Sequence, residues 1–450
     1  MRRHPHSLAL VLVLAAACRF DPTMGSFRDA ALADATVADA TPASFVVTAG
    51  GPGDDVARSI ALDRAGNIFL AGSYSGTAQF GAHTLSATHA HESFVAKLDP
   101  RGDFVWVRAL GGTAKEQPQA LALDRDGRPH VVAAFAGTIT VGGKTLEATG
   151  PADLVIAKLD PVSGGGEWAV AASRGVWNVS EDRGLAIAVD RLGQVTITGA
   201  FRSTATFGSR VLTSAGGTDI FVTRLDARGE FLWAVSAGGT DMDQGSAVAV
   251  DAGGRSYASG YFTETARFGS TELDAGGFWL AGGEPGLDRS WSCFVAEVDP
   301  QGAFERVRTP LSAPNSACNG IALVEGGSVL VTGTAGGAPF VARLNADGSI
   351  PWVLSEGFPI AGTPRIGSAI AVHPSTSSVV AITGQLPDSS AAADVLFARL
   401  DSNGCGLTAT VAGGDGDDRG NAIALDGNGN AFVAGAFSGT AVFSGETATA

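Results

Sequence analysis

The chain has 450 residues, a formal net charge of −15, 45% hydrophobic residues, 62 glycines and only 17% charged residues. This composition fits a folded protein of short strands and tight turns, and it argues against a disordered or helical chain. The negative charge argues against a nucleic-acid partner, because phosphates need a basic surface, and against docking on anionic headgroups through a basic patch.

The first 18 residues predict an export signal with a lipid-attachment site. Arg2 and Arg3 precede the apolar run Leu8–Leu14, which is too short to span a bilayer, and three alanines lead into Cys18. Small residues directly before a cysteine resemble the bacterial lipobox, which implies that Cys18 is acylated and anchors the protein in the cell envelope, with the outer membrane as the expected location. The alternative is an ordinary cleaved signal with an incidental cysteine.

Residues 19–43 are rich in Ala, Asp and Thr and show no strand alternation. Such a segment predicts a flexible tether that holds the folded part away from the membrane. The sequence therefore divides into a signal (residues 1–18), a tether (residues 19–43) and a repeat domain (residues 44–450).

One pattern returns through the repeat domain. Each unit has an IALD-type strand, a turn containing Gly, a second strand, a weaker segment, a FVAKLD-type strand, and an outgoing strand that ends in Gly-Gly. The spacing is regular, since the first-strand and third-strand aspartates of the first three units are each 36 residues apart, as in Asp63 and Asp99. In the first unit the main strands are Ser59–Asp63, Ile68–Tyr74, Ser93–Asp99 and Phe104–Leu110.

This pattern predicts an all-β propeller of about seven four-stranded blades. Apolar residues alternate or run continuously within the strands, Asp/Gly/Asn/Pro turns separate them, and helical stripes are missing. A single four-stranded unit cannot bury both of its faces, so neighbouring units must stack, and closure into a ring also protects the strand edges. The IALD-type strand is expected to be innermost, and the shorter fifth and sixth units are expected to lack the weaker segment.

The last unit stops before its FVAKLD-type strand. Residues 45–51 (FVVTAGG) look like an outgoing strand, and we expect them to join the last blade and close the ring. One strand is then still missing. Either the last blade has three main strands, or the chain is a truncated version of a longer one.

These residues resemble a bacterial β-propeller repeat family, the seven-bladed SBBP type. The family's pattern of GG-x-GDD, IA-x-D-x-x-GN-x-Y-x-x-G and FVAKLD-x-x-G is matched at Gly50–Asp55, Ile60–Gly72, Phe94–Gly102 and again at Gly413–Gly435. The resemblance covers about nine tenths of the chain. It implies the fold and little chemistry, because the family is poorly defined in function.

The loops after the outgoing strands are acidic and share one phase of the repeat, so they must emerge on one face. Paired carboxylates with loop carbonyls are what Ca²⁺ uses, which makes this face a candidate metal site. The interpretation that we favour is that these residues simply form the turns. The candidate ligands are Asp54, Asp55, Asp241, Asp243, Asp415, Asp417 and Asp418.

The segment Asp426–Asn430 opens like a calcium loop, but the twelfth position holds Phe437 instead of Glu. It predicts a hairpin turn in which Asp426 bonds its own backbone.

Four tryptophans recur at one phase of the outgoing strand, which predicts packing between blades. Trp279 and Trp291 lie instead in an insertion, and off-pattern aromatic residues on long loops are candidates for ligand contact. The alternative is a loop that covers its own blade. The four recurring residues are Trp106, Trp168, Trp233 and Trp352.

Cys293 and Cys318 each lie six residues before an equivalent landmark of the repeat, on segments expected to be neighbours within one blade. Outside the cytoplasm such a pair is a candidate disulfide, with Cys405 left over.

The chain contains no GxSxG, HExxH or CxxC, so we predict no catalytic residues and no cofactor, with Ca²⁺ the one ligand considered. The favoured hypothesis is a non-enzymatic envelope lipoprotein whose propeller presents one face to a protein or glycan. The alternative is a propeller lyase or hydrolase, or a Ca²⁺-dependent binding protein, that uses the acidic face.

Overall fold

The computed structural model describes residues 8–14, 45–112, 117–150, 152–173, 186–276, 290–311, 313, 315–355, 366–373, 380–387, 393–401, 403–404, 408–414, 416–443 and 446–449. Within them the regular structure is β-strand apart from one 3-10 turn, Glu325–Gly327. The prediction of an all-β fold is confirmed. Among the described residues, no helix is long and apolar enough to span a membrane.

The repeating element is an antiparallel sheet of four strands in chain order. In the first sheet these are β3 (Val56–Leu62), β4 (Ile68–Tyr74), β7 (Glu92–Leu98) and β8 (Phe104–Leu110). Every residue of β4 is buried, whereas β3 and β8 are only partly buried. A strand whose sheet is covered on both sides is buried on both faces, so its sequence is a continuous run of apolar or small residues.

The same strand order returns along the chain. Two further sheets are β19 (Gln244–Val250), β20 (Ser256–Thr263), β23 (Trp291–Val298) and β24 (Phe304–Arg308), then β25 (Ser316–Val324), β26 (Ser328–Ala335), β27 (Ala338–Leu344) and β28 (Trp352–Leu354). A ten-stranded sheet contains β9 (Gln117–Leu123), β10 (Pro129–Phe135), β13 (Asp153–Leu159) and β14 (Gly166–Ser173), followed by β15 (Ala186–Val189), β16 (Val195–Phe207), β17 (Arg210–Leu225) and β18 (Phe231–Gly238). A six-stranded sheet contains β29 (Ile366–Val372), β30 (Val380–Pro387), β31 (Ala393–Leu400) and β32 (Thr408–Gly414).

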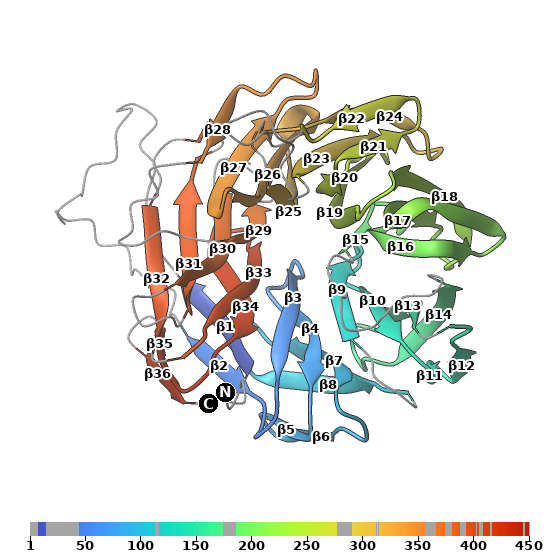
Figure 1. Ribbon diagram of the computed structural model, residues 1–450. Helices are drawn as coiled ribbons and strands as arrows, with labels where there is room; N and C mark the ends of the chain where they lie inside the picture. Colours follow the sequence, from blue (N-terminus) through green and yellow to red (C-terminus); the bar gives the residue numbers. More distant parts are fainter. Residues whose placement is uncertain are drawn as a thin grey trace.

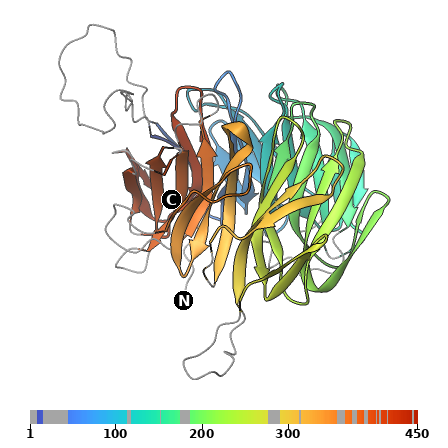
Figure 2. The same ribbon diagram turned by 90° about the horizontal axis from the view of Figure 1, so that it is seen from above.

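The first strands of these sheets form a closed circle. Contacts run from β3 to β9, β15, β19, β25, β29 and β33 (Arg419–Leu425), and from β33 back to β3. Figure 1 shows these strands around the centre with the later strands outside them, and Figure 2 shows the sheets side by side around the ring. The protein is therefore a β-propeller, and the prediction that the IALD-type strand is innermost is confirmed.

Side chains at a β-bulge in the first strand connect neighbouring sheets. The register shifts at Asn319 in β25 and at Asn421 in β33. The Asn319 amide donates to the carbonyl of Gly367 at 3.0 Å, and the Asn421 amide donates to the carbonyl of Ala57 at 2.9 Å. A bulge turns the side chain away from its regular direction. The Asn421 side chain thereby links the last sheet to the first.

The weaker segments of the repeat are short hairpins that pair with the outer strand of the preceding sheet. Ala237 of β18 pairs with Phe268, and Gly413 of β32 pairs with Val442. β26 runs to β27 without a hairpin, as predicted for the fifth unit. The hairpins are β5 (Thr77–Phe80) with β6 (His83–Ser86), β11 (Thr138–Val141) with β12 (Lys144–Glu147), β21 (Thr265–Phe268) with β22 (Thr271–Asp274), and β35 (Thr440–Phe443) with β36 (Glu446–Thr449).

The last sheet draws its strands from both parts of the chain. Its order is β33, β34 (Ala431–Ala436), β1 (Leu8–Leu14) and β2 (Val46–Ala49). The prediction that residues 45–51 close the ring is confirmed. The sheet has four strands in this structure, because its third position is held by residues 8–14, the apolar run of the predicted signal. An open strand edge has backbone N–H and C=O groups that require partners, and an apolar strand of suitable length supplies them.

Candidate functional site

Three of the seven candidate carboxylates of the acidic loops are turned inward. Asp243 is fully buried, and its two oxygens accept the backbone N–H groups of Gly239 at 2.7 Å and Thr263 at 2.9 Å. Gly239 opens the loop and Thr263 ends the second strand of the sheet, so the carboxylate holds the loop against that strand. Asp55 and Asp418 are equally buried and hold their loops in the same way, through Gly51 and Ser75 and through Gly414 and Ser438.

The interpretation of these residues as turn-formers is therefore confirmed for Asp55, Asp243 and Asp418. Asp54 is exposed, Asp417 lies 3.9 Å from Arg419, and Asp415 lies outside the described residues. Asp241 is half-buried and accepts a hydrogen bond from the Thr240 hydroxyl at 3.2 Å. In the part of the chain that the structure describes, no three His, Cys, Asp or Glu side chains are placed to hold a metal ion. The calcium site stays a prediction.

A pair of buried carboxyl groups lies in the seam between two sheets. Asp219, in the third strand β17, and Asp243, before the next sheet, both approach Gly238. A Cβ at Gly238 would lie 2.6 Å from the Asp219 Cγ and 2.8 Å from the Asp243 Oδ2. Burial raises the pKa of Asp219 to about 6 and that of Asp243 to about 7, with the charge of Asp219 adding to the second shift.

The two members of this pair differ in their hydrogen bonds. The Asp219 Oδ2 accepts the N–H of Ala215 at 3.0 Å, while its Oδ1 is buried and makes no hydrogen bond. Asp243 uses both oxygens. The Asp219 Oδ1 is therefore free of hydrogen bonds that would favour the ionised form, and the charge of Asp219 disfavours ionisation of Asp243.

A second pair occupies an equivalent seam. Asp394 in β31 and Asp418 both approach Gly413, where a Cβ would overlap the Asp394 Oδ1 and lie 2.7 Å from the Asp418 Oδ2. Burial, with the charges of Asp394 and Asp417, raises the pKa of Asp418 to about 6. Asp219 and Asp394 were not predicted from the sequence. The signal was a column of acidic residues at the start of the third strands, Glu92, Asp153, Asp219 and Asp394.

The turn that follows β33, the first strand of the last sheet, has the predicted form. The Asp426 carboxylate accepts the N–H groups of Asn428 and Asn430 at 2.9 and 2.8 Å, and the side-chain amide of Asn430 at 2.8 Å. Asp63 makes the same set with Ala65 and Asn67. The hairpin-turn interpretation is confirmed.

The recurring tryptophans join each sheet to a turn of the next. The Trp233 indole donates to the Pro300 carbonyl at 2.9 Å and covers Gly302, whose φ is +94°. A Cβ at Gly302 would lie 2.8 Å from the Trp233 ring. Trp106 and Trp168 make equivalent contacts, and Phe45 beside β2 covers Gly102 at the ring closure. Packing between blades is confirmed for these residues.

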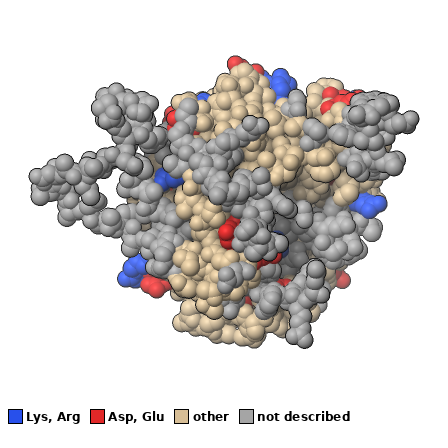
Figure 3. Space-filling model, turned by 60° about the vertical axis from the view of Figure 1, so that its left-hand side comes forward, with Lys and Arg blue, Asp and Glu red and all other residues tan. Residues whose placement is uncertain are grey.

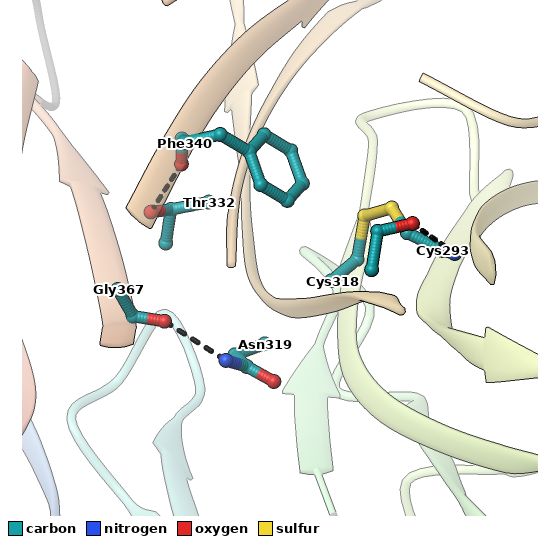
Figure 4. The surroundings of a disulfide bond; sticks show 7 residues. Cys293, Cys318, Asn319, Thr332, Phe340 and Gly367 are labelled. Carbon is teal, nitrogen blue, oxygen red and sulfur yellow. Dashed lines mark hydrogen bonds between the residues drawn. A yellow bond between two sulfur atoms is a disulfide. The ribbon is translucent and has the colours of Figure 1, made fainter. Parts of the chain in front are cut away.

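The Cys293 and Cys318 side chains form a buried disulfide with a Cα–Cα distance of 5.1 Å (Figure 4). Cys293 lies in β23 and Cys318 in β25, and the Cys293 N–H donates to the Ser316 hydroxyl at 3.1 Å. These strands belong to adjacent sheets, so the expectation that both segments lie within one blade is wrong. The first strand of one sheet packs on the third strand of the sheet before it.

The remaining predicted site residues lie at the edges of the described structure. Trp291 is the first residue of β23, pairs with Thr263 and is 39% exposed. Trp279, Cys18 and Cys405 lie outside the described residues. The ligand-contact loop and the lipidation site stay predictions.

Described Lys and Arg side chains are scattered singly over the face drawn in Figure 3 and do not gather into a patch.

No family model and no curated protein sequence matches the chain. Among solved structures, it is similar to the WD40 domain of Neurospora crassa Pan2 (11% identity, 84% of this chain and 88% of that one, TM-score 0.40). It is also similar to puromycin hydrolase (12%, 87% and 53%, TM-score 0.42) and to the calcium-binding protein regucalcin from Agrobacterium tumefaciens (10%, 73% and 81%, TM-score 0.33).

Proposed function

We propose that this protein is an exported, lipid-anchored scaffold of the bacterial cell envelope: a seven-bladed propeller of the SBBP type that binds a protein or glycan partner and has no catalytic role.

The count of seven blades is supported by the strand pairings. Each of the first strands β3, β9, β15, β19, β25, β29 and β33 begins a run of four antiparallel strands. The ten-stranded and six-stranded sheets arise because hairpins of one run pair with the outer strand of the run before it. They therefore consist of neighbouring blades with continuous hydrogen bonding, and the blade remains the repeating unit.

The buried Cys293–Cys318 disulfide carries the proposal of export. Disulfides form and persist outside the reducing cytoplasm, and this one joins two blades in the interior. It agrees with the alanines before Cys18, which predict export from a part of the sequence far from the disulfide.

A binding role is supported by the structural role of the buried acidic residues. Asp55, Asp243 and Asp418 hold the loops against the sheets and are fully buried, so their carboxylates do not face a substrate. Rigidly held loops on a ring are suited to presenting a contact surface, and residues such as Trp291 lie beside the insertion where recognition is expected.

The anchor is tested with Cys18→Ala. We expect the wild-type protein to incorporate labelled palmitate and to sediment with membranes, and the variant to lose the label and move to the soluble fraction, because an acylated cysteine supplies the membrane affinity. Cys405→Ala is the matched control and should behave as wild type. Unchanged fractionation of Cys18→Ala would refute the anchor.

A further inference from the structure

We infer that the buried Asp219–Asp243 pair is a binding site for Ca²⁺, and that the ion joins the blade containing β17 to the blade that begins with β19 (Figure 1). This site differs from the calcium site predicted on the acidic loops, because Asp219 lies outside those loops and both carboxyl groups are buried. The inference goes beyond the proposed function and does not depend on the anchor at Cys18. We call Asp219, Asp243 and the adjoining Gly238 the seam site.

Two backbone segments bring the carboxyl groups of the seam site together. The loop after β18 lies along the residues that precede Asp219 in β17. The Gly217 N–H donates to the Thr240 carbonyl at 3.0 Å. The Asp243 N–H donates to the Thr218 carbonyl at 2.7 Å. The positions of both carboxyl groups are thus fixed by backbone hydrogen bonds, and a preorganised site loses little conformational freedom when it binds.

Gly238 leaves space for an ion between the two side chains. A Cβ at this residue would lie 2.6 Å from the Asp219 Cγ, 2.9 Å from the Asp219 Oδ2 and 2.8 Å from the Asp243 Oδ2. These distances are too short for any side chain, so the convergence of the two carboxyl groups requires glycine here. Oxygen ligands lie about 2.3–2.6 Å from Ca²⁺, so one ion beside Gly238 can contact both carboxyl groups.

A buried oxygen without a partner indicates that the seam site takes a ligand. Asp219 is 3% exposed, and its Oδ1 is buried and makes no hydrogen bond. Such an oxygen is costly, because burial removes the water that would otherwise bind it. The Asp243 oxygens accept backbone N–H groups, and a carboxylate oxygen with one such bond retains a further lone pair. The seam site therefore offers several oxygen lone pairs to a cation.

The charge of the seam site also calls for a cation. Among the described residues, no Lys or Arg charge acts on Asp219 or Asp243. Burial raises the pKa of both groups, and the charge of Asp219 raises that of Asp243 further. Two buried carboxylates need a positive partner to ionise together, and one divalent ion neutralises both. In the metal-free protein the carboxyl groups hold protons instead.

The ligand chemistry favours Ca²⁺ over other metal ions. Carboxylate and carbonyl oxygens are hard ligands, which suit Ca²⁺ and Mg²⁺ better than they suit softer transition metals. Ca²⁺ accepts about six to eight oxygens in flexible geometry, whereas Mg²⁺ requires a near-ideal octahedron and gives up its water reluctantly. Thr240 is exposed and Asp241 is half-buried, so the loop over the seam site is reached by water, which can complete the ligand shell of Ca²⁺.

The seam between β23 and β25 is joined in a different way. Ser292 stands at the position of Asp219, seven residues before the third-strand aspartate. Ser316 stands at the position of Asp243, three residues before the first-strand bulge. This seam has serines in place of the carboxyl pair, and the Cys293–Cys318 disulfide links its strands. A link between blades is therefore found where the pair is replaced, which agrees with an ion that links the blades at the pair.

The seam site is tested on the full chain after treatment with EGTA at neutral pH. Equilibrium dialysis with radioactive Ca²⁺ counts the bound ions, and isothermal titration calorimetry with CaCl₂ or MgCl₂ gives the affinity. The test variant is Asp219→Asn, because the Asn carbonyl can still accept the Ala215 N–H while the charge is lost. The matched control is Asp241→Asn, which removes a carboxylate from the same loop that accepts a hydrogen bond from the Thr240 hydroxyl.

We expect wild-type protein to bind Ca²⁺ with a dissociation constant of about 1 mM or below, the range of extracellular calcium modules. Asp219→Asn should bind one Ca²⁺ fewer per chain, and Asp241→Asn should bind as many as wild type. The readout is the ion lost rather than the total, because the Asp394–Asp418 pair has a similar arrangement at Gly413. Mg²⁺ should bind at least about tenfold more weakly. Ca²⁺ should raise the melting temperature of wild type more than that of Asp219→Asn, because it binds the folded protein.

Three results would overturn the inference. The first is wild-type protein that neither binds Ca²⁺ nor shifts its melting at about 10 mM CaCl₂, a result that needs no variant. The second is an unchanged number of ions in Asp219→Asn that is folded by circular dichroism. The third is equal affinity for Mg²⁺, which would remove the assignment to Ca²⁺. The Cys18→Ala fractionation decides the anchor without reference to the seam site, so failure of one proposal is distinguishable from failure of the other.

Discussion

The Asp219 and Asp243 carboxyl groups couple the stability of the propeller to pH. Burial raises the pKa of both groups, to about 6 and about 7, so the folded protein retains protons that the unfolded chain has lost. Stability from this source is complete below about pH 4, the ordinary range for Asp, and is lost as the pH rises toward 7. Asp55 and Asp418, each with a pKa raised to about 6 by burial, act in the same direction.

We therefore predict that Asp219→Asn reduces the loss of stability between pH 5 and pH 8. The Asn carbonyl can accept the Ala215 N–H, as the Asp219 Oδ2 does at 3.0 Å, and its amide can donate to the Asp243 carboxylate. Asp219 and Asp243 together should lower the wild-type free energy of unfolding by about 4 kcal/mol over this range, and the variant should lose less. Thermal melting at both pH values measures the difference. Asp103→Asn, at an exposed site, is the control, and an unchanged pH dependence in Asp219→Asn would contradict the prediction.

At the scale of strands and turns, the blades are joined by one repeated contact. An outer-strand side chain covers a glycine in the turn of the next blade, as Trp233 covers Gly302 and Trp106 covers Gly164. Where the tryptophan is replaced, the contact is kept, since Arg306 donates to the Ala346 carbonyl at 2.6 Å and lies over Gly348. The glycines are needed because φ is positive and because no Cβ fits beneath the ring.

We predict that Gly302→Ala lowers the free energy of unfolding by about 2–3 kcal/mol. The new methyl would lie 2.8 Å from the Trp233 ring at a φ of +94°, so strain and overpacking add. The comparison variant is Gly427→Ala, where a Cβ meets nothing within 4 Å and where stability should change by no more than about 0.5 kcal/mol. Chemical denaturation of both variants measures the two effects. Equal destabilisation would show that the turn contact does not link the blades.

For the whole molecule, periodicity in the sequence predicted the features that each unit repeats. The strand order, the innermost first strand and the closing role of residues 45–51 follow from side-chain alternation and turn spacing, which are local. The seam pairs Asp219–Asp243 and Asp394–Asp418 were missed because each combines residues of different blades, and their proximity depends on how the blades stack. The position of residues 8–14 in the last sheet was not predicted. An unpaired strand edge can pair with any extended segment through backbone hydrogen bonds, so the sequence of residues 8–14 does not indicate this pairing.

The disulfide between adjacent blades gives the last prediction, on the stability of the ring as a whole. Cys293 and Cys318 are separated by 25 residues, and closing a loop of this length in the unfolded chain is worth about 3 kcal/mol. The oxidised protein should therefore melt at a higher temperature than the protein reduced with dithiothreitol, and Cys293→Ala/Cys318→Ala should melt low under both conditions. Cys405→Ala should keep the wild-type difference between oxidised and reduced protein. Because Cys293 and Cys318 are fully buried, reduction should be slow until neighbouring blades separate, so the rate of thiol labelling reports how often this seam opens. Melting that does not respond to reduction would show that blade packing alone holds the seam.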